Sequence, residues 1–301
     1  QAHQNKDGYW AELVGYKLNT GYEALDDKPL PHVGVTALAL MSFLAGGHLP
    51  DRGKYGDVLK RGIDFVVSCA QDDGQITDHG TRMYSHAFAT LFLAEVYGMS
   101  ATEATKKTLE RAVNLIVDCQ NEYGGWRYKP FDREVDLSVT VCQVQALRAA
   151  RNIGIRVPPD TIERAMDYVR KSRVPSGYAA GLFYYKLYGP RAPQKPTEYS
   201  INAAALTALA CAGVHDDEIA DPVLTFLARE YAGIADYYRT HFYYWYGNYY
   251  AAQAFYQAGG PRLRSYYQRL CQDLLAGQRA DGSWRNDVGP GDEFATAVAC
   301  I

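Results

Sequence analysis

A turn pattern that recurs along the chain constrains its fold more than any other feature. The pattern Gln-x-x-x-Gly-x-Trp occurs at Gln4–Trp10, Gln120–Trp126 and Gln278–Trp284, and a shortened form runs from Gln71 to Ile76. Gln71 and Gln120 are 49 residues apart, and Gln120 and Gln278 are 158 apart, which is about three repeats of similar length. Recurrence at a fixed period is typical of repeat architectures, so we predict a repeated unit of about 50 residues.

Two kinds of helix alternate between these turns. The first kind is amphipathic, with its charges on one face, and is predicted over residues 57–71, 103–120, 161–173 and 262–278. The second kind is nearly uncharged and rich in small residues, and begins near Val35, His86, Ser138, Ile201, Tyr249 and Ala295. A helix that is apolar all round is buried on all sides. The alternation therefore predicts six inner helices surrounded by amphipathic outer ones.

The predicted fold class is all-α, an (α/α)6 toroid with inner and outer helix rings, in a single domain over residues 1–301. A closed ring is favoured over an open superhelix, because an open solenoid needs polar capping repeats. Strand signals are short and never come in hairpin pairs. The chain starts on a turn and stops inside an inner helix, so we expect one outer helix beyond one of its ends.

Composition excludes several classes of function. The net charge of −3 and the pI near 6.2 create no field that attracts nucleic acid or anionic lipid. No apolar run approaches the ~20 residues that span a bilayer. The absence of an initiator Met leads us to expect that an upstream segment was removed, and a signal peptide is one possibility. Six cysteines without CxxC spacing indicate buried thiols and a reducing compartment, although compartment and protein partner stay open.

The turns, the small-residue helices and the period together resemble the terpenoid cyclase and protein prenyltransferase repeat proteins. The resemblance extends over essentially the whole chain. It implies an α/α toroid whose central cavity holds an isoprenoid chain. Members that cyclise squalene carry an Asp-x-Asp-Asp-Thr motif whose central Asp protonates an alkene. Aligning Thr140 with the Thr of this motif places Asp136 on the first Asp and Ser138 on the central one. Because a hydroxyl is too weak an acid for this step, we expect that activity to be absent.

Two other branches of the resemblance are predicted to be absent. Protein prenyltransferases bind zinc through an Asp-x-Cys pair and a distant His, and zinc needs three protein ligands. Glu134-Val135-Asp136 with Cys142 is similar to a stretch of that family that binds no metal, and the segment KPTEYSINAAAL lacks the required pair. No metal and no cofactor are therefore predicted. The Cys-Gly-Glu-Gln motif of the complement-like thioester domains is also missing.

Polar residues stand near the amino ends of the predicted inner helices, which would gather at one rim of a toroid. Free amide groups at such ends favour anions. As catalytic candidates we take Asp136, His86 and His241, with Asp136 as acid or base and the histidines steering charge or holding a head group. The ligand-binding candidates are His32, Ser138, Glu198, Tyr199, Asn202, Tyr244 and Asn248. Helix capping is the alternative explanation of Asp136, Ser138 and Glu198, and hydrogen-bonded packing is the alternative explanation of His86 and His241.

The stretch THFYYWYGNYYAAQAFY, residues 240–256, contains ten aromatic residues if His241 is counted. Tyr and Trp rings attract cations, stack on sugars or fill a core. Three functions stay open: binding or transformation of an isoprenoid or other elongated apolar ligand, binding of a glycan or protein without catalysis, and glycan processing. The last needs two carboxylates, for which Asp136 and Glu198 form the pair to test.

Overall fold

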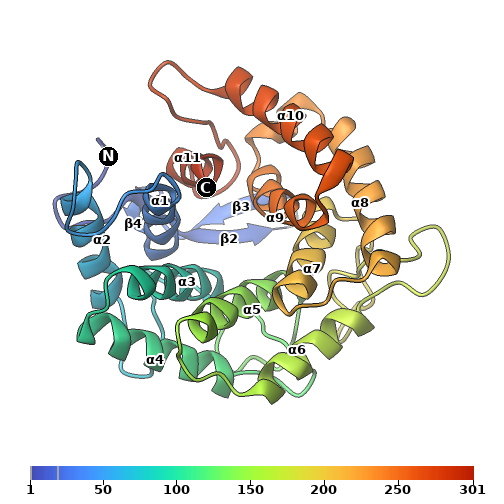
Figure 1. The fold of residues 1–301 in the computed structure, drawn as a ribbon, viewed down its shortest axis with the longest axis horizontal. Helices are drawn as coiled ribbons and strands as arrows, with labels where there is room; N and C mark the ends of the chain where they lie inside the picture. The colour runs from blue at the N-terminus through green and yellow to red at the C-terminus, as the bar shows by residue number, and fades with distance from the viewer. Residues whose placement is uncertain (1, 19) are drawn as a thin grey trace. The chain divides into compact units, whose positions relative to one another are not determined.

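The computed structural model describes residues 2–18 and 20–301, and helices dominate it (Figure 1). The predicted inner helices are α1 (Val33–Ala45), α3 (Met83–Met99), α5 (Leu137–Asn152), α7 (Tyr199–Cys211), α9 (Phe242–Ala258) and α11 (Asp292–Cys300). The amphipathic helices are α2 (Gly56–Ser68), α4 (Glu103–Asp118), α6 (Pro159–Lys171), α8 (Asp217–Ala232) and α10 (Gly260–Gly277). A 3-10 helix, η1, covers Asp236–Thr240. The two kinds of helix alternate along the described chain as predicted.

Burial separates the two kinds. In α1 the first nine residues are all buried, and in α7 a run of ten is buried. In α6, by contrast, buried positions such as Ala165 and Val169 recur on one face only. The sequence did not predict α8, because its acidic start is typical of a loop. Asp216 instead caps this helix by accepting the N–H of Glu218 at 2.9 Å, and negative charge is favourable in a first turn.

Four short strands correct the expectation that strands would not pair in hairpins. β1 (Ala11–Glu12) pairs antiparallel with β4 (Leu30–Pro31). β2 (Gly15–Leu18) and β3 (Gly21–Ala24) form an antiparallel hairpin. Gly15 lies so close to the carbonyl oxygen of Glu23 that a Cβ atom would collide with it, so this pairing depends on glycine. Strands of two to four residues carry too little alternation to be recognised from sequence.

The contacts divide the chain into two compact units. The first comprises Gln1–Asp118, Ala146–Val157 and Arg279–Ile301, and the second comprises Cys119–Gln145 and Pro158–Gln278. In the first unit α1 packs against α2, α3 and α11, and α3 packs against α4 (Figure 1). In the second unit α7 packs against α6, α8 and α9, and α10 packs against α9. A single domain over residues 1–301 stays a prediction.

In two of the turns, the glutamine side chain binds the turn to an amphipathic helix. This helix comes directly after the inner helix that follows the turn. The Gln120 side chain donates to the carbonyl oxygens of Gly124 and of Thr161, at the start of α6, both at 2.8 Å. Gln4 makes the equivalent bonds to Gly8 and Val58 at 3.0 and 2.9 Å. The glycine of each turn has a positive φ, and at Gly8, Gly74 and Gly124 a Cβ atom would also collide with a helix carbonyl oxygen, so these positions require glycine.

The last residue of each turn is fastened to the inner helix by a hydrogen bond. The backbone N–H of each motif Trp donates to a threonine hydroxyl: Trp10 to Thr36, Trp126 to Thr140 and Trp284 to Thr296, at 3.0–3.1 Å. The shortened turn uses the same bond with another acceptor, because Ile76 N–H donates to Nδ1 of His86 at 2.9 Å. His86 and Thr140 are both fourth residues of their helices. His86 therefore has the place in α3 that Thr140 has in α5.

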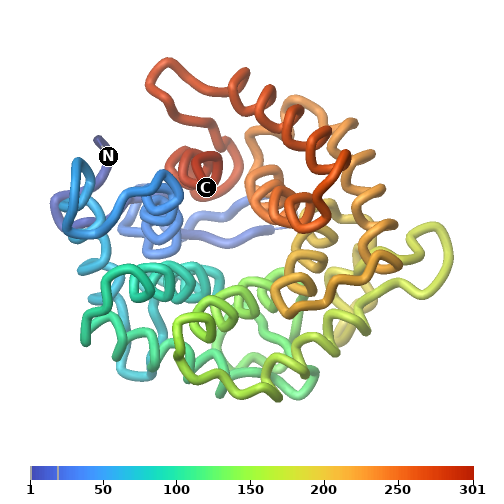
Figure 2. The backbone as a smooth tube through the Cα atoms, in the orientation of Figure 1, coloured from blue at the N-terminus to red at the C-terminus, as the bar shows by residue number. Residues whose placement is uncertain are grey.

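The connection from α6 to α7, residues 172–198, adds irregular structure to the second unit (yellow-green in Figure 2). Isolated bridges shape it, since Arg173 pairs with Phe183 and Lys186 with Gln194. It delivers Tyr185 and Lys186 to the amino end of α5, where Leu137 N–H donates to the Tyr185 carbonyl oxygen at 2.9 Å. Within residues 2–18 and 20–301, every helix is too short or too polar to cross a membrane.

Candidate functional site

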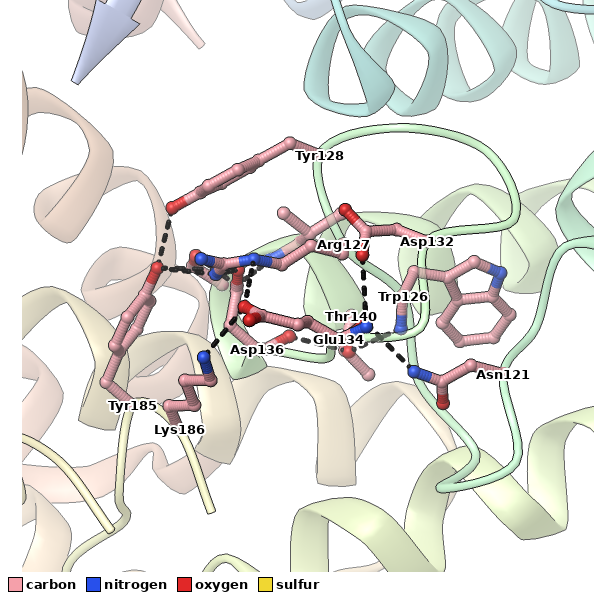
Figure 3. Close-up of polar contacts among 12 residues, drawn as sticks. Asn121, Trp126, Arg127, Tyr128, Asp132, Glu134, Asp136, Thr140, Tyr185 and Lys186 are labelled. Atoms are coloured by element: carbon pink, nitrogen blue, oxygen red, sulfur yellow. Dashed lines mark hydrogen bonds and ion pairs between the residues drawn. The ribbon is translucent and has the colours of Figure 1, made fainter. Parts of the chain in front are cut away.

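The candidate site lies at the amino end of α5 in the second unit, where two loops meet (Figure 3). The first loop leads from the turn at Trp126 back to Asp136, and these two residues form an antiparallel bridge. It carries Arg127, Tyr128 and Glu134. The second loop is the α6–α7 connection. Chain segments about 50 residues apart thus place charged and phenolic side chains around one helix end.

Asp136 is the centre of this site and is completely buried. One of its carboxylate oxygens, Oδ1, accepts the Ser138 hydroxyl at 2.6 Å and the Val139 N–H at 2.9 Å. The other, Oδ2, accepts from the Arg127 guanidinium in an ion pair and from the Tyr185 hydroxyl at 3.4 Å. All four neighbours are donors. The site therefore holds Asp136 as a hydrogen-bond acceptor that both caps α5 and pairs with a cation.

A second charge pair and two phenols surround this centre. Lys186, which is 5 % exposed, contacts Glu134 Oε2 at 2.7 Å. The Tyr128 and Tyr185 hydroxyls share a hydrogen bond at 2.6 Å, and Arg127 donates to the Tyr185 hydroxyl at 3.1 Å. The Arg127 guanidinium also lies 4.1 Å from the centre of the Tyr128 ring. Two cations face two carboxylates, so the formal charges of the cluster sum to zero.

The pKa values in the site reflect this pairing. Burial alone would lower the pKa of Arg127, but the Asp136 charge raises it above the usual value. The hydrogen bond from Lys186 lowers the pKa of Glu134. Burial, together with the Asp136 charge, raises the pKa of Tyr185. The cluster thus favours a charged Arg127, a charged Glu134 and a neutral Tyr185.

Of the predicted site residues, the structure brings Asp136 and Ser138 together. Ser138 stands where the cyclase motif has its central Asp, and its hydroxyl donates to Asp136. Its carbonyl oxygen accepts the Tyr246 hydroxyl of α9 at 2.9 Å. The Tyr250 hydroxyl contacts the Cys142 sulfur at 3.1 Å. The inner stretch of α5 is therefore joined to the aromatic segment through side chains in the second unit.

His86 belongs to the first unit and is fully buried. Its Nδ1 accepts the Ile76 N–H, and its Nε2 lies 3.3 Å from the carbonyl oxygen of Ala112. Burial lowers the pKa of this imidazole to about 4. A neutral ring that donates through Nε2 satisfies both contacts. The geometry is that of a structural fastener, and the catalytic role stays a prediction.

His32 and His241 both cap inner helices. Nδ1 of His32 accepts the Val35 N–H of α1 at 3.2 Å, and burial lowers the pKa of His32 to about 4. Nδ1 of His241 accepts the Tyr243 N–H of α9 at 3.1 Å. The His241 ring stacks on Tyr238 at 5.2 Å between centroids. Helix capping, which the sequence did not predict for either residue, therefore accounts for both positions.

The remaining candidates, all in the second unit, lie near α7 and α9. Tyr199 and Tyr266 both donate to Asn248 Oδ1, at 2.9 and 2.8 Å. Asn248 in turn donates to the carbonyl oxygen of Tyr244 at 2.9 Å. These four residues, of which Tyr199 is half-buried and the others are buried, form a cluster that joins α7, α9 and α10. Its polar atoms point at one another, which is the arrangement of a satisfied core network.

Asn202 and Glu198 stand at the start of α7. Asn202 Oδ1 accepts the Phe183 N–H at 2.9 Å, so it fastens the α6–α7 connection as Thr140 fastens its turn. Glu198 precedes the helix without capping it and lies 3.5 Å from Lys195.

Sequence reasoning missed five members of the cluster as site residues: Arg127, Tyr128, Glu134, Tyr185 and Lys186. One signal was available for Arg127, because an arginine directly follows the Trp in two of the three full motifs, at Arg127 and Arg285. The partners of Tyr185 and Lys186 could not be read from the sequence.

Three further features bear on function: possible metal ligands, the cysteines and a cavity. In residues 2–18 and 20–301, no three His, Cys, Asp or Glu side chains are grouped as metal ligands. The six cysteines are all described and form no disulfide. Cys69, Cys119 and Cys142 are buried, but Cys211 and Cys271 are half-buried and Cys300 is exposed, contrary to the expectation of buried thiols. A cavity of about 420 Å³ lies between the ends of α7 and α9 and the first turns of α8 and α10. It includes none of the predicted site residues.

Comparison with solved structures places this fold in a known class. The type II terpene cyclase MstE from Scytonema, in complex with geranylgeranyl dihydroxybenzoate, matches with a TM-score of 0.64 at 12% identity, over 99% of this chain and 91% of that one. The GH76A α-1,6-mannanase of Salegentibacter matches with a TM-score of 0.70 at 9% identity, over 99% and 92%. An α-amylase from Clostridium perfringens matches with a TM-score of 0.67 at 9% identity, over 99% and 92%.

These neighbours include α/α toroid enzymes, and they confirm the predicted fold class and the resemblance to terpenoid cyclases. No protein-family model matches the chain. None of the curated proteins is detectably similar to it in sequence. At identities of 9 to 12% the likeness establishes the fold, and one fold of this class carries both isoprenoid and glycan chemistry.

Proposed function

We propose that this protein binds an isoprenoid or another elongated apolar ligand, and that it does not begin a cyclisation by protonating an alkene from the Asp136 position. The observation that carries this proposal is the state of the motif residues. Ser138 replaces the central acid, and Asp136 is occupied by four donors that include an arginine. A proton donor must present a bound proton to its substrate. Asp136 is instead held as an acceptor.

The aromatic segment of α9 supports a ligand with an apolar body. Tyr246 and Tyr249 are half-buried, and each packs edge-on against the buried Tyr250, at 4.8 and 4.9 Å between centroids. Aromatic faces contribute large apolar contact areas, and their hydroxyls provide polar edges. Beside them Gln145 donates to Gln253 Oε1 at 2.8 Å. This surface would suit a hydrocarbon chain that also carries a polar group.

Glycan processing is the second candidate, favoured by the TM-score of 0.70 to a mannanase. It would require a general acid and a base or nucleophile. Of the pair Asp136 and Glu198, the first is committed to Arg127, which weakens its fitness as an acid. Glycan binding without hydrolysis on the same phenols is compatible with this arrangement.

A thermal-shift panel tests the proposal. The protein is heated with geranylgeranyl diphosphate, squalene, and α-1,6-linked mannose oligomers. A ligand at a hundred times its dissociation constant adds about 2.7 kcal/mol of stability, which corresponds to roughly 5 °C in a domain of this size. We expect a shift with an isoprenoid. A shift with the mannose oligomers alone would show that the protein binds glycans and would refute the isoprenoid proposal.

Two variants locate the binding. Tyr246→Ala should abolish the isoprenoid shift if the α9 surface holds the ligand. Ala258→Trp, in the separate cavity near α10, is the matched control and should leave it unchanged. Incubation of squalene with the wild type should give no cyclised product by mass spectrometry and chromatography. A cyclised product that disappears in Asp136→Asn would show that Asp136 does donate protons.

A further inference from the structure

A carboxyl group outside the candidate site joins two parts of the first unit. Glu12 belongs to β1 and is 7 % exposed. Its Oε1 accepts the backbone N–H of Glu293, in the first turn of α11, at 2.7 Å. The neighbouring Leu13 N–H donates to the carbonyl oxygen of Pro290 at 3.0 Å. The strand near the start of the chain therefore caps the last helix through one side chain and one backbone bond.

The packing around Glu12 requires a glycine. Gly291 has a φ of 139°, which L side chains rarely adopt, and a Cβ atom there would overlap the Glu12 carboxylate. Only glycine at position 291 therefore leaves room for the Glu12 carboxylate at the start of α11. Only Ala295 and Ala297 of the nine residues of α11 are buried, and the helix also packs against α1 and accepts the Trp284 N–H through Thr296. The Glu12 contact is the one that joins its amino end to β1.

The charges that face Glu12 are unfavourable to its ionised form. From α11, Glu293 and Asp292 are both acidic. Asp292 is paired with Arg279 at 2.8 Å, and Glu293 is paired with the exposed His3. From β3, the Tyr22 hydroxyl donates to the Leu13 carbonyl oxygen at 2.8 Å.

Against this, the N–H of Glu293 and the amino end of α11 favour a negative charge. Burial outweighs them and, with the two acidic neighbours, raises the pKa of Glu12 from 4.5 to about 8.

We propose that Glu12, Gly291 and Glu293 form a proton-dependent clasp that holds α11 to β1 and loosens as protons are withdrawn. A carboxyl group whose pKa is higher in the closed state than in the open state binds more protons when closed. Closure is then most favourable below the open-state value of about 4.5. It weakens about tenfold per pH unit between about 4.5 and about 8 and changes no further above that range.

Hydrogen–deuterium exchange of the full chain tests the clasp. Protection factors, which correct for the intrinsic effect of pH on exchange, are measured from pH 5 to 9 for α11 and for α1 of the same unit. Protection of α11 should fall steeply up to about pH 8 and then level off, with a shallower fall in α1. Parallel loss of protection in α1 and α11 would overturn a local clasp.

Two variants separate the charge of Glu12 from its packing. Glu12→Gln keeps an acceptor for the Glu293 N–H but cannot ionise, so α11 should stay protected without the pH slope. The wild-type slope in this variant would overturn the proposal. Glu293→Gln keeps the backbone donor and removes one like charge, so the slope should end at a lower pH. This second variant tests the proposal even if Glu12→Gln fails to fold, because an unmoved end point would contradict it.

Discussion

The amino ends of α3 and α5 follow the same kind of turn, but they differ in the side chains that fasten the turn and cap the helix. In α5, Thr140 fastens the turn, and the preceding Asp136 caps the helix and pairs with Arg127. In α3, His86 does the fastening, and the preceding Arg82 makes no capping bond with its side chain. In α3, the imidazole at the fourth helix position thus has a structural role. In α5, the charged groups gather around the residue just before the helix. The residue type alone does not reveal which position has the structural role and which carries the charge.

The largest effect should come from breaking the charge pair at α5. Asp136→Ala removes both the cap and the main partner of Arg127, and leaves this largely buried cation with only the longer ion pair to Glu134 at 3.6 Å. We expect a loss of about 3–5 kcal/mol in the free energy of unfolding, measured by urea denaturation. The combined variant Arg127→Met with Asp136→Asn should recover part of this loss, because the cap remains and no charge is stranded. If the combined variant were as unstable as Asp136→Ala, the ion pair would not be the cause.

The turns themselves can be compared by adding a methyl group to their glycines. Gly124→Ala and Gly74→Ala each place a Cβ atom against a helix carbonyl oxygen at a positive φ. We expect each to cost roughly 2–4 kcal/mol by denaturant unfolding. Gly154 has a similar φ of 86° with open space around it, so Gly154→Ala should cost only about 1–2 kcal/mol. Equal costs in all three variants would show that backbone strain, and not contact with the helix, sets the need for glycine.

A smaller effect is expected at α3, and it depends on pH. His86→Ala leaves the Ile76 N–H buried without an acceptor, at a cost of about 1–3 kcal/mol. His86→Asn should retain most of the stability, since Asn202 serves the same function in α7.

The pKa of His86 is lowered from 6.5 to about 4, so the unfolded chain binds more protons in this range. The wild type should therefore lose stability as the pH falls from 6.5 to 4, and His86→Asn should lose less. Melting temperatures of both proteins across that range decide the matter. Identical pH profiles would exclude His86 as the titrating group.

The smallest effect is expected at the outer edge of the α5 cluster. Tyr128→Phe removes the hydroxyl that contacts Tyr185 but leaves the ring under Arg127. We expect a loss of about 0.5–1.5 kcal/mol in urea unfolding. Tyr185→Phe should cost more, because its hydroxyl also contacts Arg127 and Asp136. The reverse order would place the centre of the network at Tyr128.

Much of the fold could be predicted from local pattern. The inner helices were found because small, uncharged residues follow one another without a polar face, and the turns were found because glutamine, glycine and tryptophan recur at fixed offsets. The α8 helix was missed because its acidic cap and first turn are typical of a loop, and the β2–β3 hairpin because four residues carry too short an alternation. Local signals fail where an element is short or begins with charge.

The candidate site was predicted in part. Asp136 and Ser138 were identified because the resemblance fixed their places relative to Thr140. Arg127 and Lys186 were not, because nothing in their neighbouring residues indicates burial or a partner. His86 and His241 were chosen for their titratable side chains, yet their ring nitrogens accept backbone N–H groups.

The sequence by itself determined the repeat, the alternation of helix types and the loss of the acid at Ser138, because these depend on residues at fixed local distances. Only the tertiary structure decided the partners of each polar side chain. Arg127 meets Asp136 and Tyr185, Lys186 meets Glu134, and Glu12 meets the start of α11. Such contacts depend on the paths of loops between distant segments, and a buried charge acquires its role from the groups that surround it in space.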